Sequence, residues 1–177
     1  MTNFLKFFVF ISIVTLFNQQ TTHAQAFYGR GDVILQIGAD FQSKATGISG
    51  SLDFGLADNI SVGVVSSYVL GLERVKDNSG NQVPIANFKD RFDIKGRLNA
   101  HLGNLFSAES RFDIYPGLYL STKNFGGHVG VRYFFTYGLG IFSEVHFPIS
   151  KFDTGTLTPA EKLNNQTTFN IGLAFGI

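Results

Sequence analysis

The sequence lacks cysteine and tryptophan altogether, and it has few charged residues for its length of 177. Without cysteine the chain forms no disulfide and no thiolate metal site. Charged residues make up 15% of the chain and the net charge is only +1, which argues against a nucleic-acid partner. What is abundant instead is phenylalanine and glycine, with 20 of each. The length suits one domain better than two.

The one long apolar run is too short to cross a bilayer as a helix. Phe7–Phe17 is uncharged but has only eleven residues, whereas a membrane-spanning helix needs about twenty. Lys6 precedes this run, and Ala24-Gln25-Ala26 follows with small residues that suit a peptidase. This arrangement predicts a secretory signal peptide over 1–26, cleaved after Ala24 or Ala26, and a single domain over 27–177. Removal of Lys6 would leave basic and acidic residues in balance.

The stretch Phe88–Leu102 shows the clearest pattern in the chain, because polar and apolar side chains alternate along it. Its odd-numbered positions carry Lys89, Arg91, Asp93, Lys95, Arg97, Asn99 and His101. Its even-numbered positions from 92 onward carry Phe92, Ile94, Gly96, Leu98, Ala100 and Leu102. A period of two is the period of a β-strand. The stretch therefore predicts a strand with one charged face and one apolar face.

Seven further segments alternate in the same way, and no segment after the signal has a helical period. The eight predicted strands are Asp32–Gln42, Gly47–Leu56, Ile60–Leu72, Phe88–Leu102, Glu109–Ser121, Gly127–Phe135, Leu139–Ile149 and Gln166–Ile177. Connections 57–59, 103–108 and 136–138 are short, whereas 73–87 and 150–165 are long and polar. The fold class predicted is all-β: an eight-stranded antiparallel up-and-down barrel. Pro116 falls within the fifth strand, where we expect a bulge.

Two closed barrels fit this alternation, and they differ in which face points inward. A soluble periplasmic carrier of the lipocalin type would keep its apolar face inside, whereas a membrane barrel turns that face to lipid. About five bulky apolar residues on each of eight strands would not fit inside so narrow a barrel. Aromatic residues also gather near both ends of the apolar face, as in membrane girdles: Phe54, Phe112, Phe135, Phe175, Tyr68, Phe92, Phe147 and Phe169. We therefore expect a transmembrane β-barrel with its polar face inside.

With that orientation the charged residues lie inside the barrel, where they must be paired. The interior network is predicted to comprise Lys89, Arg91, Asp93, Lys95, Arg97, His101, Arg111, Asp113, Arg132, Glu144 and His146. Asp40 and Asp53 are further acids on this face. The expectation is a salt-bridged, closed interior and not an open pore.

The last strand points to a known class of protein. Thr168–Ile177 alternates with Phe169, Ile171, Leu173, Phe175 and Ile177 on one face. Together with the architecture over Asp32–Ile177, this resembles small outer-membrane β-barrels of Gram-negative bacteria, such as outer membrane protein A and its relative outer membrane protein X. The phenylalanine-rich composition also resembles barrels from the Bacteroidota. The resemblance implies that these five residues are read by the barrel-assembly machinery, and that outer-membrane lipid and lipopolysaccharide surround a monomer.

No constellation in the sequence indicates catalysis, a metal or a cofactor. His101, His128 and His146 lack metal-ligand spacing, and no histidine lies near a serine on the apolar face, as a lipid A-modifying enzyme would require. We expect a structural or surface-interaction role, with loops 73–87 and 150–165 as the exposed surfaces. The alternatives are a lipid A-modifying enzyme and a narrow pore.

Overall fold

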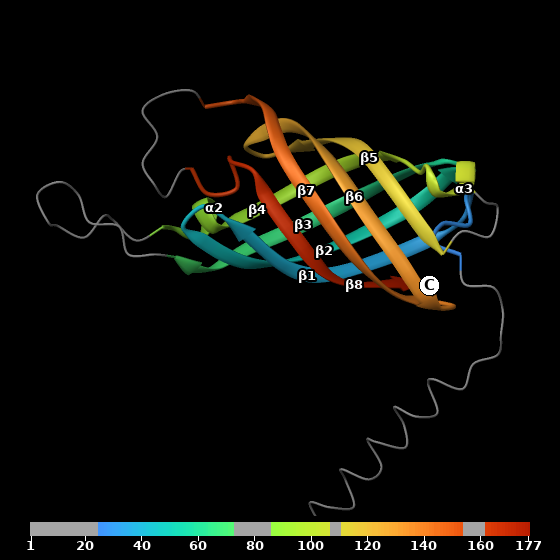
Figure 1. Ribbon diagram of the computed structural model, residues 1–177. Coiled ribbons are helices and arrows are strands. Elements are labelled where there is room, and N and C mark those ends of the chain that lie inside the picture. Colours follow the sequence, from blue (N-terminus) through green and yellow to red (C-terminus); the bar gives the residue numbers. More distant parts are fainter. Residues whose placement is uncertain (1–24, 73–85, 107–110, 154–161) are drawn as a thin grey trace, which may run out of the picture.

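Eight strands close into one barrel in the computed structural model, which describes residues 25–72, 86–106, 111–153 and 162–177 (Figure 1). Each strand pairs antiparallel with its neighbours in the chain, and β1 pairs with β8 to close the barrel. The strands are β1 (Val33–Gln42), β2 (Ala45–Ala57), β3 (Ile60–Leu72), β4 (Phe92–Ala100), β5 (Phe112–Ser121), β6 (Asn124–Thr136), β7 (Leu139–Lys151) and β8 (Thr168–Gly176). The predicted eight-stranded up-and-down barrel is confirmed.

Several predicted features fall outside the described residues. These are most of the signal segment (1–24), the greater part of loop 73–87 (73–85), the connection 107–110 and the middle of loop 150–165 (154–161). The predictions made for them stay predictions. Neither of the two described helices, α2 (Phe88–Arg91) and α3 (Gly103–Phe106), is long and apolar enough to span a membrane.

The two ends of the barrel differ in their connections. At one end, called the short-turn end, residues 58–59 and 137–138 join strands directly, and Gly138 takes the left-handed conformation that such a turn needs (φ +84°). Ile177 N donates to Val33 O there, so the carboxyl terminus lies beside the start of β1 (Figure 1). At the other end, called the loop end, lie α2 and the connections that precede β4 and β8 (Figure 1).

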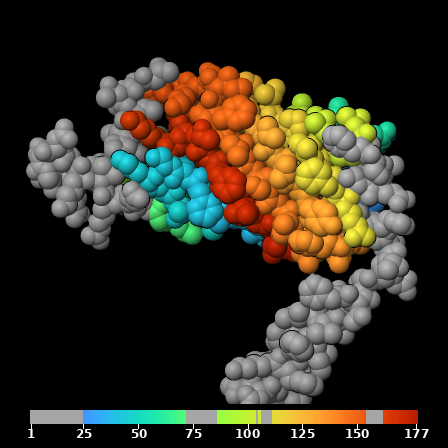
Figure 2. Space-filling view, in the orientation of Figure 1, coloured from blue at the N-terminus to red at the C-terminus, as the bar shows by residue number. Residues whose placement is uncertain are grey.

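Side chains alternate between the inside and the outside of the barrel along each strand. In β4, Asp93, Lys95, Arg97 and Asn99 are buried, whereas Ile94 and Leu98 are exposed. The outside is mostly apolar, although Ser66 of β3 also lies there. Figure 2 shows the side chains of β1, β8 and β7 covering this wall side by side. The inside is mainly polar. This is the predicted arrangement of the two faces.

The predicted fourth strand starts too early, because its first turn is helical. Asn87 N donates to the Asp90 carboxylate (2.8 Å) and Arg91 N donates to Asn87 O (3.2 Å), which closes the turn called α2 and delays β4 until Phe92. Such reciprocal capping competes with a strand locally. The alternation of charges from Lys89 onward could not reveal it.

The bulge predicted at Pro116 is also wrong. Pro116 lies opposite Val129 in a β5–β6 ladder whose register does not shift. On its other side the β4–β5 pairs end at Asn99↔Gly117, so Pro116 is one residue beyond them. Beyond it Leu102 N still donates to Ile114 O, so the proline interrupts the β4–β5 pairing without shifting its register.

Two glycines on opposite faces give a matched test of how tightly the interior is packed. A Cβ on Gly130, inside β6, would lie 2.2 Å from Tyr115 Cζ, whereas a Cβ on Gly96, outside β4, meets nothing within 4 Å. Gly130→Val should therefore lower the free energy of unfolding by about 1–3 kcal/mol through overpacking. Gly96→Val should leave it unchanged or raise it slightly. Urea unfolding in detergent micelles measures both, and equal effects would contradict this packing.

Candidate functional site: the polar interior of the barrel

Eight of the eleven predicted network residues lie buried inside the barrel: Asp93, Lys95, Arg97, His101, Asp113, Arg132, Glu144 and His146. The other three do not. Lys89 is exposed on α2, and Arg91 beside it turns its guanidinium to the backbone oxygens of Val69, Leu70 and Ala86 at the loop end. Arg111 is exposed just before β5. The assignment of these three to the interior is corrected, because each lies outside the strand that would turn it inward.

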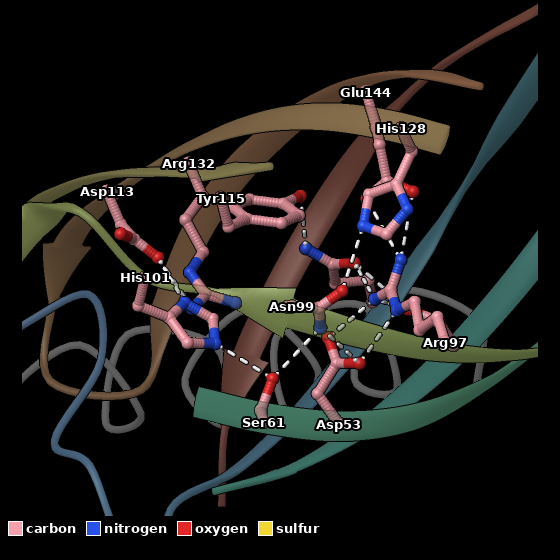
Figure 3. Close-up of polar contacts among 12 residues, drawn as sticks. Asp53, Ser61, Arg97, Asn99, His101, Asp113, Tyr115, His128, Arg132 and Glu144 are labelled. Carbon is pink, nitrogen blue, oxygen red and sulfur yellow. Dashed lines mark hydrogen bonds and ion pairs between the residues drawn. The ribbon is translucent and has the colours of Figure 1, made fainter. Parts of the chain in front are cut away.

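Arg97 occupies the centre of the interior and binds two carboxylates from opposite strands (Figure 3). Its Nε donates to Asp53 Oδ1 (2.7 Å), and its Nη1 donates to both oxygens of Glu144 (2.9 and 3.0 Å). Its Nη2 also reaches Gln36 and Ser51, each at 2.9 Å. The guanidinium is thus saturated with acceptors, and β1, β2, β4 and β7 are tied together across the barrel. A desolvated charge needs this full set of partners to be tolerated.

A one-way chain of hydrogen bonds runs from this centre toward the short-turn end. Asn99 Nδ2 donates to Ser61 Oγ (2.9 Å), so the Ser61 hydroxyl is free to donate to His101 Nε2 (2.8 Å). His101 Nδ1 lies 2.7 Å from Asp113 Oδ2 and 2.8 Å from Arg132 Nη2. Because an ionised carboxylate only accepts, the contact with Asp113 favours the tautomer with the proton on Nδ1, next to the Arg132 donor. Figure 3 shows Ser61, His101 and Asp113 in this order.

The Asp113 carboxylate receives further donors that hold it charged and in place. Arg132 Nη2 donates to its Oδ2 (2.8 Å) and Gly103 N donates to its Oδ1 (2.9 Å). Arg132 also lies over the Tyr115 ring, 4.7 Å from its centroid. This cation–π contact stabilises the charged guanidinium inside the barrel. The aspartate is therefore fixed as an acceptor for His101.

A second group of rings and charges lies on the other side of Arg97. His128 and His146 are direct neighbours in the β6–β7 ladder and stack with centroids 5.3 Å apart. His146 Nε2 contacts Glu144, and His128 Nε2 donates to Asn99 Oδ1 (2.8 Å). Nearer the loop end Lys95 pairs with Asp93 (3.6 Å). Among the described residues no group of three or more histidine, aspartate or glutamate side chains is placed to hold a metal ion.

Residues before β1 close the short-turn end of the interior. Ala26 and Phe27 are buried against Ile34 and against Phe134, Phe142 and Ala174 from β6, β7 and β8. The Phe27 ring stacks on His101 with centroids 3.6 Å apart and an interplanar angle of 19°. This plug segment, residues 25–32, thus covers the hydrogen-bonded chain that ends at Asp113.

Lys123 closes the loop end, in the turn between β5 and β6. Its ammonium donates to the backbone oxygens of Asp90 (2.6 Å) and Leu163 (3.2 Å), which join α2 to the segment before β8. Burial lowers the pKa of Lys123 from its ordinary value, although Asp93 and Asp90 act against this shift. Asn124 beside it binds Asn164 and Asn165, so polar contacts cover this end of the interior.

The sequence did not single out the neutral members of the network. Gln36, Ser51, Ser61 and Asn99 each hydrogen-bond to other members of the network, and all four lie on the predicted polar faces. Their position on the polar face of each strand could have identified them. The prediction considered only residues that can carry a charge, and it therefore omitted these four. The predicted assembly residues lie on or beside the last strand: Phe169, Ile171 and Leu173 face outward, Phe175 is half-buried and Ile177 is exposed.

The fold and its interior define the class: a closed eight-stranded barrel that is apolar outside and charge-paired inside. The chain belongs to the family of unknown function DUF6646, whose model matches residues 16–177. No curated protein matches the chain. A solved structure described as "De novo design of transmembrane beta-barrels" is similar to it, with 12% sequence identity and a TM-score of 0.49, over 84% of this chain and 97% of that one.

Proposed function

We propose that the chain is an outer-membrane protein of a Gram-negative bacterium that spans the membrane as a monomeric, closed β-barrel. The observation that carries this proposal is the reversal of polarity, with apolar side chains outside and ion pairs inside. Ile37, Ile48, Leu98 and Leu173 are about half exposed on the outer wall, whereas Arg97 and its two carboxylates are buried within. A soluble protein rarely exposes so large an apolar surface to water, whereas a membrane barrel needs an apolar outer surface where it contacts lipid.

Two further features suit a bilayer. A closed ladder leaves no unpaired strand edge, which the hydrocarbon region demands. Aromatic rings lie on the outer wall near both ends: Phe54, Phe112 and Phe135 toward the short-turn end, and Phe147 and Phe169 toward the loop end. Rings in these positions suit the two interfaces of a membrane.

The role that fits such a barrel is structural or surface-interacting, because its interior offers no passage. Side chains from opposite strands meet at Arg97, and both ends are covered by further contacts. The likeness in pattern to outer membrane proteins A and X and to Bacteroidota barrels supports the same role. Its partners would be lipid, lipopolysaccharide through the loop end, and the assembly machinery through β8.

The location is tested by following the secreted chain into membrane fractions. We expect it in the outer-membrane fraction, resistant to extraction by urea, and shifted in gel mobility between unboiled and boiled samples, because a folded barrel stays compact in detergent. Recovery as a soluble periplasmic protein would overturn the proposal and favour a carrier.

The closed interior is tested separately by electrical recording. The purified barrel in planar bilayers should show no discrete conductance steps, because Arg97, Asp53 and Glu144 fill its cross-section. A matched large-pore porin, reconstituted in the same way, supplies the positive control. Reproducible single-channel conductance steps from the folded barrel would show that it is a pore and not a closed barrel.

A further inference from the structure

The hydrogen-bonded chain at the short-turn end has the atom order of a nucleophilic triad. Ser61 Oγ lies 2.8 Å from His101 Nε2, and His101 Nδ1 lies 2.7 Å from Asp113 Oδ2. Each side chain comes from a different part of the barrel: β3, the residue after β4, and β5. We propose that Ser61, His101 and Asp113 form a latent serine-esterase site beneath the plug segment. This goes beyond the membrane role proposed above, which stands whether or not Ser61 reacts.

The tautomer with its proton on Nδ1 is the one that this chemistry needs. Asp113 accepts from Nδ1, which leaves the Nε2 lone pair directed at the Ser61 hydroxyl as a base. Arg132 and Gly103 are positioning residues that keep the carboxylate charged and oriented. Asn99 Nδ2 lies 2.9 Å from Ser61 Oγ while it also donates to Asp53, and it is the N–H that would turn to an oxyanion.

The plug segment occupies the place where a substrate would sit. The Phe27 ring lies flat on His101, and Ser61 is 0% exposed with this ring in place. Around Phe27 the interior is apolar, with Ile34, Phe134 and Phe142 in one cluster. Withdrawal of Phe27 would leave a pocket of about its own size beside the nucleophile. The substrate class is therefore a carboxylic ester with an apolar acyl group no larger than a benzyl side chain.

The reaction uses only the ester and water. Ser61 Oγ bonds to the carbonyl carbon while its proton passes to His101 Nε2 and the carbonyl π electrons move to oxygen. Collapse of this intermediate breaks the bond to the alcohol oxygen, which leaves with the proton from Nε2. Water then attacks the acyl-serine by the same route, and the carboxylic acid and free Ser61 are released.

The test is labelling with a small fluorophosphonate probe, which bonds to activated serines, on the folded barrel in detergent micelles. Phe27→Ala should label at least tenfold faster than the unaltered chain, since the ring over His101 is gone. Mass spectrometry should place the adduct on Ser61, and p-nitrophenyl butyrate hydrolysis should rise in parallel. Phe27→Val serves as a second opening variant where Phe27→Ala yields too little folded barrel.

The controls separate a reactive site from a structural contact. Ser61→Ala in the Phe27→Ala background should abolish both labelling and hydrolysis. Ser67→Ala, which removes another buried interior hydroxyl of β3 away from His101, should change neither. Two results would overturn the proposal. The first is a folded Phe27→Ala or Phe27→Val barrel that gains no adduct on Ser61. The second is equally fast labelling of the opened barrel with and without Ser61.

Discussion

Arg97→Leu is expected to destabilise the folded barrel by about 3–5 kcal/mol, the typical effect of breaking a buried ion pair by removing one partner. The arginine is buried and donates to Asp53 and Glu144 from opposite sides. Leucine fills part of its volume but leaves two carboxylates facing each other without a cation. Urea unfolding of the barrel in vesicles, followed by the shift in gel mobility, measures the loss.

Two sets of variants show whether the loss comes from charge. Arg111→Leu removes the same side chain at an exposed position and should change stability by less than about 0.5 kcal/mol. Asp53→Asn and Glu144→Gln added to Arg97→Leu should recover much of the loss, since no unpaired charge then remains. An unchanged midpoint for Arg97→Leu alone would show that these ion pairs contribute nothing to the folded state.

The alternation of the sequence was sufficient to predict the barrel, because each face of a strand repeats every second residue. Residues 93 to 99 illustrate this, with polar side chains inside and apolar ones outside as expected. The same pattern failed at Lys89 and Arg91, where reciprocal contacts of Asn87 and Asp90 close a helical turn. Local capping depends on backbone geometry that alternation does not encode.

The pairing of the interior could not be predicted to the same depth. Asp53, Arg97 and Glu144 meet across the lumen from β2, β4 and β7, so their contact depends on the stagger of the strands around the barrel. The sequence supplied the acids and bases but not that stagger. The contact of Ser61 with His101 was missed for the same reason, since 40 residues separate them along the chain.

Phe27 was missed for a different reason. It lies ahead of the first strand, in a segment without alternation, and beside the predicted cleavage sites. Its burial depends on packing against Phe134, Phe142 and Ala174 at the short-turn end. Only the closed barrel brings these three strands around it.

Ile37→Arg is expected to destabilise the barrel in a bilayer by about 2–4 kcal/mol, the effect of a cation at mid-depth on the lipid face. Ile37 lies midway along β1 with 54% of its surface exposed on the outer wall. Its neighbours across the ladder are Gly50 and Leu173, and neither offers a counter-charge. Unfolding by urea from lipid vesicles gives the free-energy difference directly.

The matched position is Leu105, an aliphatic residue of α3 that is 68% exposed at the short-turn end, beyond the strands. Leu105→Arg should cost no more than about 1 kcal/mol, because a cation near the interface stays hydrated. The two variants differ mainly in the depth of the arginine in the membrane, because the residue replaced and the charge added are nearly the same. In a soluble carrier both positions would face water and both arginines would be tolerated alike. A difference of less than about 0.5 kcal/mol between them would therefore contradict the assignment of the outer wall to lipid.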